Sequence, residues 1–371
     1  MPAMKKRWYN IKLLWIKASL CSKGDKDSFY PYHVLAKKCD IQEMIGSWDN
    51  AYKVWERNLE AAINANDGQL SSECKHRIGI LLSKKGNYDE ATVYIEKAKE
   101  YYEGANDVKN LAYTLGSLGN IHLEKGDYKK ADEKYRQKLA LCERISDQQG
   151  ISAVHRTLGN IYLDTGDYEK ARSNYANSFD IALRLNDKRG MGYALGNQGS
   201  VHLYKKEYAE AMALFLQNLE ISSQLGDKKS VALVLGNIGS VHYYQKEYPA
   251  ALEYYTQQKS IYKVIGDLRG ELTATGNSGS VYDEQGLPEK ALECYNMAIY
   301  LAEKIGQKMQ LCYFYQYRSS LYYGIGRFED ALADINTSIK IAEAIGKSDV
   351  ISEAKALKEN IEKNQGIPKS L

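Results

Sequence analysis

The stretch Leu195-Gly-Asn-Gln-Gly-Ser-Val-His-Leu-Tyr-Lys-Lys-Glu-Tyr-Ala-Glu-Ala211 returns forty residues later as Leu235-Gly-Asn-Ile-Gly-Ser-Val-His-Tyr-Tyr-Gln-Lys-Glu-Tyr-Pro-Ala-Ala251. Such a repeat decides the fold, because each copy is one unit that buries its apolar face against the next. Steps of forty from the second glycine of the stretch reach Gly79, Gly119, Gly159, Gly199, Gly239, Gly279 and Ser319. Steps of forty from its closing alanine reach Ala51, Ala91, Ala131, Ala171, Ala211, Ala251, Ala291 and Ala331. The sequence therefore predicts a continuous array of eight units.

Each unit has the pattern of two helices. In residues 187–226, Asp187 is suited to cap a first helix, whose apolar or small residues recur every three or four positions. A second helix is predicted to begin near Tyr208 and to end before Gly226. Three other units carry glycine between their two helices, where it supplies the left-handed conformation that ends a helix. These pairs are Gly86-Asn87, Gly126-Asp127 and Gly166-Asp167. The sequence therefore predicts an all-α protein.

The sizes of the repeated residues indicate close helix packing. A large residue follows each repeated alanine by four positions, and a small residue beside a large one lets two helices interdigitate. The large residues are Trp55, Ile95, Tyr135, Tyr175, Phe215, Tyr255, Tyr295 and Ile335.

This pattern resembles the tetratricopeptide repeat (TPR): a small residue on the first helix, an alanine twelve residues later and a large residue four further on. The resemblance covers residues of about 32–347. The forty-residue period resembles the variant in Pins/LGN-type cell-polarity adaptors and in sensor segments of bacterial ATPases, cyclases and kinases. The resemblance implies an α-solenoid, a right-handed superhelix of about eight antiparallel helix pairs. It also implies that the first helices line a concave groove that binds peptides.

The two ends differ from the repeats. Residues 1–40 hold nine Lys or Arg and three Asp or Glu, and we expect residues 1–30 to form a basic helical extension. The repeats are expected over residues 31–347, and residues 348–371 are expected to form a capping helix and a tail. The predicted cap has a narrow apolar stripe, which a terminal unit needs to shield its outer face. The stripe consists of Ile351, Ala354, Leu357 and Ile361.

Composition and motifs exclude several classes of function. A net charge of +3 argues against a dominant nucleic-acid or membrane interaction. There is no apolar run of about eighteen residues, which a membrane span requires. The six cysteines form no CxxC pair, so we expect a reducing, cytoplasmic location. Without a catalytic, metal-ligand or nucleotide-binding motif, we expect no enzymatic activity and no cofactor. His122, His202 and His242 share one repeat position with Tyr162, Tyr282 and Tyr322, which favours a packing role over metal binding.

The candidate binding residues are polar side chains on the expected inner face. An asparagine amide can donate to and accept from a peptide bond at once, so a row of asparagines fits recognition of an extended chain. Bridging between neighbouring repeats is the alternative role for these amides. The candidates are Asn197, Asn237 and Asn277 two residues before the repeat glycine, Asn120 and Asn160 one residue after it, Arg156, and Tyr193, Tyr204, Tyr243 and Tyr244.

A second set of glycines has two interpretations. Gly116, Gly196, Gly236 and Gly276 lie in register three residues before the repeat glycine. Because glycine inside a helix costs about 1 kcal/mol relative to alanine, the set requires a reason. Either neighbouring helices approach closely there, or a bound peptide backbone does.

The sequence favours a protein–protein interaction scaffold that binds an extended segment of a partner in its groove. The alternative is the sensory or regulatory arm of a larger signalling ATPase, cyclase or kinase system. The sequence identifies neither the partner nor the oligomeric state.

Overall fold

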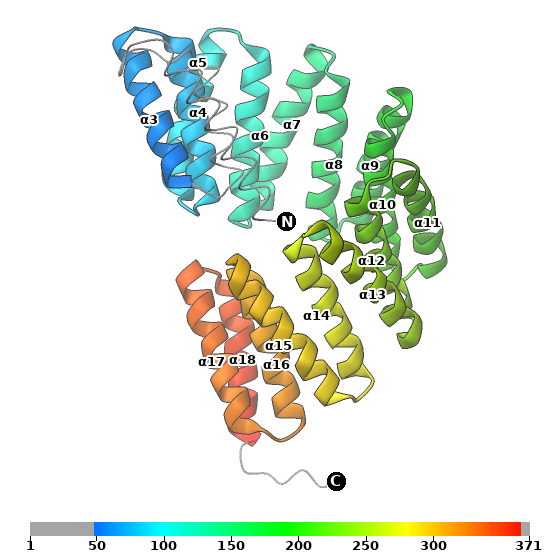
Figure 1. Cartoon of the computed structure of the whole chain (residues 1–371). Coiled ribbons are helices and arrows are strands. Elements are labelled where there is room, and N and C mark those ends of the chain that lie inside the picture. The colour runs from blue at the N-terminus through cyan, green and yellow to red at the C-terminus, as the bar shows by residue number, and fades with distance from the viewer. Residues whose placement is uncertain (1–47, 365–371) are drawn as a thin grey trace, which may run out of the picture. The chain divides into compact units, whose positions relative to one another are not determined.

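A computed structural model describes residues 48–364 of the chain. The predicted N-terminal extension over residues 1–30, the residues up to 47 and the tail after residue 364 lie outside the described part. The described residues form sixteen helices, labelled α3 to α18, and no strand (Figure 1). The odd-numbered helices are α3 (Trp48–Asn64), α5 (Tyr88–Gly104), α7 (Tyr128–Arg144), α9 (Tyr168–Arg184), α11 (Tyr208–Gln224), α13 (Tyr248–Ile265), α15 (Pro288–Ile305) and α17 (Phe328–Ile345). The even-numbered helices are α4 (Gly68–Lys84), α6 (Val108–Glu124), α8 (Gln148–Asp164), α10 (Lys188–Tyr204), α12 (Lys228–Tyr244), α14 (Leu268–Glu284), α16 (Lys308–Gly324) and α18 (Ser348–Asn364).

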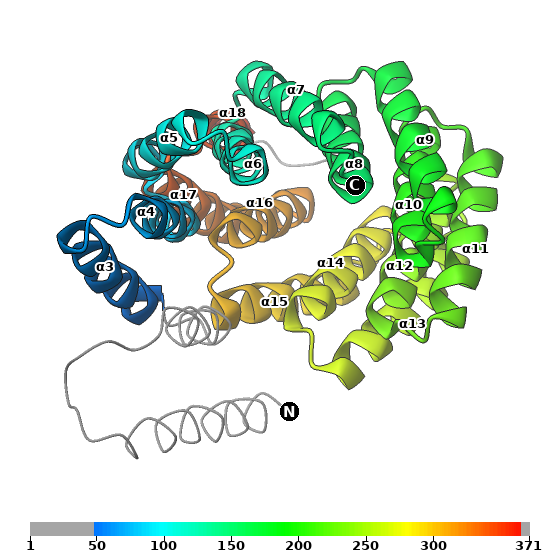
Figure 2. The same ribbon diagram turned by 90° about the horizontal axis from the view of Figure 1, so that it is seen from above.

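The helices belong to two compact units that meet at Gly190 and Met191, near the start of α10. Unit 1 is the part before this point and unit 2 the part after it. Within unit 1, α4, α6 and α8 form one layer and α5, α7 and α9 the other (Figure 2). In unit 2, α12 and α14 form the inner layer of the curve, and α14 touches α12 directly. The predicted all-α fold of consecutive, pairwise packed helices is confirmed.

Helix ends follow the predicted capping pattern. The carboxylate of Asp227 accepts a hydrogen bond from the backbone amide of Ser230 at 3.2 Å, and the same bond recurs at other first helices. Gly126 ends its helix with a φ of 74°, in the left-handed region that suits glycine. Lys206 and Lys246 replace that glycine in two of the repeats and adopt φ values of 61° and 62°.

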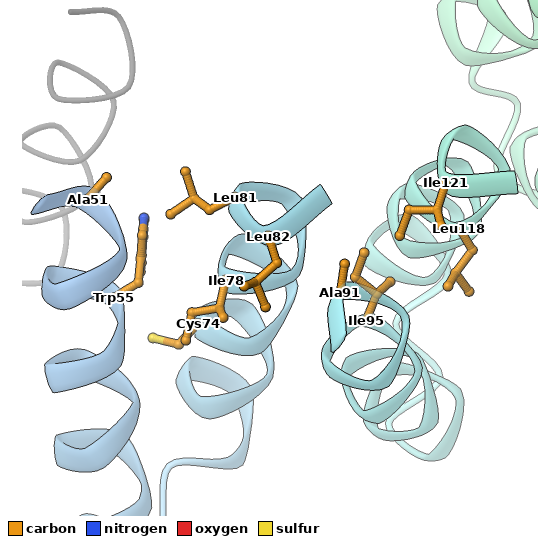
Figure 3. Packing of buried hydrophobic residues seen from close by; sticks show 10 residues of the cluster. All are labelled: Ala51, Trp55, Cys74, Ile78, Leu81, Leu82, Ala91, Ile95, Leu118 and Ile121. Atoms are coloured by element: carbon orange, nitrogen blue, oxygen red, sulfur yellow. The ribbon is translucent and has the colours of Figure 1, made fainter. Parts of the chain in front are cut away.

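The repeated residues form the core as expected. All eight repeated alanines are fully buried. In unit 1, Ala91 and Ile95 of α5 lie between side chains of α4 and of α6 (Figure 3). A Cβ atom added at Gly119 would lie 2.7 Å from the ring of Tyr135, and one at Gly239 would lie 2.8 Å from Tyr255. The repeat glycine therefore makes room for the large residue of its own unit.

The second set of glycines also lies against side chains of the protein. A Cβ atom added at Gly116 would lie 2.8 Å from the Lys138 ammonium, and one at Gly236 would meet the Gln258 amide. In the last repeat the large and small residues change places. Gln316 stands at the glycine position, and its amide donates a hydrogen bond to the hydroxyl of the small Ser338 at 3.3 Å. The side chain seven residues after the repeated alanine thus fills the space at Gly116, Gly196 and Gly236. At Gly276 the ring of Phe314, from the next first helix, fills it instead. This arrangement favours close helix packing as the reason for the glycines.

Candidate functional site

One stripe of each even-numbered helix is exposed on the inner side. It consists of the residues six and two before the repeat glycine and one and five after it, a spacing that places them on one helix face. On α12 these are Leu233, Asn237, Ser240 and Tyr244, with Leu233 50% and Tyr244 55% exposed. We call this face the inner stripe. Eight of the ten predicted residues lie on it; Arg156 and Tyr243 lie directly beside it.

A cleft in unit 1 lies between two of the inner stripes. Its volume is 490 Å³, and its walls are the inner stripes of α4 and α6. The wall from α6 includes Ser117, Asn120 and Glu124, and Ile95 of α5 forms part of the floor. A first-helix stripe thus faces open space, while the second helix closes the groove from below.

The asparagines of unit 1 take part in the packing of their own helix pairs. The hydroxyl of Tyr135 donates to Oδ1 of Asn120 at 2.5 Å, and Tyr175 donates to Asn160 at 2.7 Å. Burial raises the pKa of Tyr135 to about 12, so its hydroxyl remains a donor at neutral pH. Both asparagines are exposed, but their side-chain oxygens are already occupied. Their predicted contact with a peptide remains a prediction.

The asparagines of unit 2 differ. Ser240 now stands one residue after the repeat glycine, and its hydroxyl lies 3.1 Å from that of Tyr255. Within residues 48–364, the side chains of Asn237 and Asn277 make no hydrogen bond, and both are half-buried on the inner stripe. Asn197 has an interaction partner of its own. Asn237 and Asn277 therefore have both their amide donors and their amide oxygens available to a ligand.

The predicted tyrosines provide exposed aromatic surface. Tyr193 and Tyr204 on α10 are 42% and 62% exposed. Tyr243 is half-buried, and its ring packs edge-on against Tyr244 with centroids 5.3 Å apart. Burial, with a smaller contribution from the Glu284 carboxylate, raises the pKa of Tyr243 to about 12. Arg156 is half-buried and already interacts within the protein.

Sequence reasoning missed the side chains that the second helices contribute. Lys138 of α7 lines a second cavity of 260 Å³ in unit 1, together with Lys109 and Tyr113 of α6 and Asp147. Burial lowers the pKa of Lys138, and its ammonium lies 5.9 Å from the centre of the Tyr113 ring. One signal was present in the sequence: the residue seven after the alanine is Lys138, Asn218 or Gln258 where the facing first-helix residue is Gly116, Gly196 or Gly236. Gly276, which faces Ala298, does not follow this pattern.

The repeated histidines form hydrogen bonds at helix ends. Nδ1 of His202 lies 2.6 Å from the Glu207 carboxylate, and Nδ1 of His242 lies 2.6 Å from that of Glu247. Over the part of the chain that the structure describes, no group of three His, Cys, Asp or Glu side chains has the arrangement of a metal site. None of the described helices is long and apolar enough to cross a membrane.

Comparisons with known proteins identify the repeat. A sequence profile described as tetratricopeptide repeat matches residues 71–144, 110–184, 150–224, 190–263 and 230–304, which together span more than half of the chain. A profile described as anaphase-promoting complex subunit 5 matches the shorter segment 288–364. No curated protein sequence matches the chain.

Solved structures share the fold at low sequence identity. Aspartyl phosphate phosphatase F from Bacillus subtilis is 15% identical with a TM-score of 0.62, and the match covers 94% of this chain and 93% of that one. A Rap protein complexed with competence and sporulation factor is 14% identical with a TM-score of 0.56, over 90% of this chain and 98% of that one. A signal-transduction ATPase from Pyrococcus horikoshii with a tetratricopeptide repeat sensor is 18% identical with a TM-score of 0.55, over 92% of this chain and 56% of that one. These likenesses show the fold alone.

Proposed function

Because the chain belongs to the tetratricopeptide repeat family, we propose that it is a protein-interaction scaffold that binds an extended segment of a partner along the inner stripes of unit 2. The predicted resemblance to this family is thereby confirmed. The binding of a peptide and the residues that contact it are the proposal.

The observation that carries the proposal is the pair of amides at Asn237 and Asn277, which have no hydrogen-bond partner among the described residues. They occupy the same register position on α12 and α14, which touch each other. Each amide offers two donors and one acceptor, which match the donor and acceptor of a peptide unit. Packed helices lie roughly 8–10 Å apart and an extended chain advances about 3.3 Å per residue, so the two amides would contact residues about three apart.

The decisive experiment measures affinity and stability of the same variants. Heptapeptides that bind the intact chain are first selected from a random displayed library. One selected peptide is then titrated by calorimetry into the wild type and into the variants Asn237→Ala and Asn277→Ala. Each substitution should weaken binding by about 1–2 kcal/mol, because one peptide unit loses its partners. The melting temperature should not fall, since neither amide forms a hydrogen bond within residues 48–364. Unchanged affinity in both variants would overturn the proposal.

Asn160→Ala is the matched control. It removes the same side chain from an inner stripe, but in unit 1, where the amide oxygen accepts from Tyr175. It should lower stability and leave the affinity of the selected peptide unchanged.

The alternative role as a regulatory arm uses the same groove and differs in what the scaffold controls. This chain spans 56% of the similar signal-transduction ATPase, which carries its repeats as a sensor. An ATPase, cyclase or kinase encoded beside this chain would favour the regulatory role.

A further inference from the structure

A cluster of aromatic and acidic side chains lies beside the two free asparagines in unit 2. It consists of Tyr243 and Tyr244 at the end of α12, Asp283 and Glu284 at the end of α14, and Tyr317 on α16; we call it the aromatic–acidic cluster. Tyr244 is 55% and Tyr317 46% exposed. Glu284 is exposed and Asp283 half-buried. The cluster therefore presents ring surface and negative charge to solvent together.

Electrostatic effects among these side chains place them in one neighbourhood. After burial, the carboxylates of Glu284 and Asp283 contribute to raising the pKa of Tyr243. Burial raises the pKa of Tyr317, with smaller contributions from Glu353 and Tyr244. Tyr244 of α12 thus acts on Tyr317 of α16. The helix between them in chain order is α14, which has the small Ser280 on its inner stripe.

The ring of Tyr317 is held in place from below. Its centroid lies 6.1 Å from that of Tyr295 and 6.0 Å from that of Phe314, in an edge-on arrangement with the latter. Tyr317 occupies the register position that Asn237 and Asn277 occupy in the two preceding repeats. A peptide that passes both asparagines in this direction meets the Tyr317 ring next.

Among the residues that the structure describes, the carboxylates of the cluster have no cation beside them. In the described residues, neither Asp283 nor Glu284 forms an ion pair. The nearby guanidinium of Arg318 is occupied by Asp334, with N–O distances of 2.6 and 2.7 Å, and also donates to Asn296. This differs from Asp267 of the same unit, which pairs with Lys229 at 2.8 Å.

Exposed aromatic faces beside unpaired carboxylates suit a cationic group. The faces of tyrosine rings attract ammonium and guanidinium ions, and carboxylates form strong hydrogen bonds with them. Glu284 lies two turns from Asn277 on the same stripe, roughly 10 Å away, which a long side chain of a peptide held at Asn277 can span. We propose that the aromatic–acidic cluster binds a lysine or arginine side chain of the partner segment. The inference rests on the proposed function, and it states which charge the site prefers in the segment that it binds.

The test selects heptapeptides from the displayed library twice, once for binding to the intact wild-type chain and once for binding to Glu284→Lys. The substitution lies at an exposed position. Wild-type selection should enrich arginine or lysine at one fixed peptide position, and Glu284→Lys should remove this preference. In a synthetic selected peptide, replacing that arginine by citrulline keeps its shape and removes its charge. This replacement should weaken binding to the wild type roughly tenfold, and should have little effect on binding to Glu284→Lys.

Matched variants separate the cluster from general electrostatics. Asp164→Lys reverses a charge at the same register position in unit 1 and should leave the selected sequences unchanged. Tyr317→Leu keeps apolar surface without the ring and should reduce the advantage of arginine over citrulline. Selected peptides without a basic residue, or a preference that survives Glu284→Lys, would overturn the inference. If Asn237→Ala still weakens such peptides, the proposed function stands; if no peptide is selected, both fail.

Discussion

Units 1 and 2 share one repeat but use the same register positions differently. In unit 1 an asparagine one residue after the repeat glycine accepts the hydroxyl of the large tyrosine, as Asn160 does for Tyr175. In unit 2 Ser240 contacts the tyrosine hydroxyl instead, and Asn237, two residues before the glycine, has no hydrogen-bond partner in the described part of the chain. The comparison teaches that a repeat residue becomes available for binding only when another residue satisfies the polar groups of the core.

The units also differ in how charges are placed on them. Lys109 and Lys138 line the smaller cavity of unit 1 together with Asp147. In unit 2 the exposed rings of Tyr244 and Tyr317 stand beside unpaired carboxylates. Four substitutions or conditions test whether these contrasts hold, and the largest expected effect comes from acid.

Acid should destabilise unit 1 through His76. Burial, with a smaller contribution from the Arg77 charge, lowers the pKa of His76 to about 4, and its Nε2 lies 2.8 Å from the Ser117 hydroxyl. Between pH 6.5 and 4 the unfolded chain binds a proton that the native state does not, so stability is full above about pH 6.5 and falls as the pH drops. The loss should reach about 3 kcal/mol near pH 4.

Hydrogen exchange at pH 7 and pH 4.5 measures this effect in each unit. Helices α4 and α6 should lose protection on acidification, and His76→Gln should remove much of the loss. Equal loss in the variant would show that another group is responsible.

One facing pair of residues in unit 2 should accept the side-chain sizes that the equivalent pair has in unit 1. Unit 1 has His76 on its first helix where unit 2 has Gly236, and Ala98 on its second where unit 2 has Gln258. Gly236→His alone should destabilise by roughly 1–3 kcal/mol, because the ring meets the Gln258 amide. Adding Gln258→Ala should recover most of this loss. Urea denaturation of the four proteins gives the coupling energy, and additive effects would contradict the pairing.

Removing one asparagine from each unit should have unequal effects on folding. Asn160→Ala removes the acceptor of a fully buried tyrosine and should cost about 1 kcal/mol. Asn237→Ala should cost nothing measurable, since no bond is lost and alanine favours the helix. Chemical denaturation compares the two directly. Equal destabilisation would place Asn237 in the packing of unit 2 and would end the contrast between the units.

The smallest effect concerns Lys138, which fills in unit 1 the space that Gln258 fills in unit 2. Its half-buried ammonium forms no ion pair among the described residues, and burial lowers its pKa. Lys138→Met keeps most of the length of the side chain without its charge and should raise stability by up to about 1 kcal/mol. Lys99→Met is the control and should lower stability, because Lys99 pairs with Glu96 at 3.1 Å. Thermal melting distinguishes the two signs.

Much of the fold was predictable because its determinants are local or periodic. The repeated alanines, the capping aspartates and the helix at Ser348–Asn364 all follow from spacing along the chain. Helix periodicity places Asn237 and Tyr244 on one face, but the resemblance to the tetratricopeptide repeat, and not the spacing, supplied the choice of that face as the inner one. The sequence left open which amides are free.

That second question depends on contacts between residues far apart. Whether Asn120 is available depends on Tyr135, fifteen residues later on another helix. The influence of Tyr244 on Tyr317 depends on how α12, α14 and α16 pack, which no short pattern encodes. Tyr317 therefore had no special place in the sequence prediction.

The constant spacing of the repeat has a consequence for the length of the ligand. Because no insertion interrupts the forty-residue period, a further copy of residues 227–266 joins the array without a new type of connection. Each copy adds one helix with an asparagine in the position of Asn237. For a scaffold of the proposed kind, one added copy lengthens the shortest bound segment by about three residues, the number of extended residues that span one helix spacing. The number of repeats with a free amide thus sets the minimum length of the recognised segment, independently of its sequence.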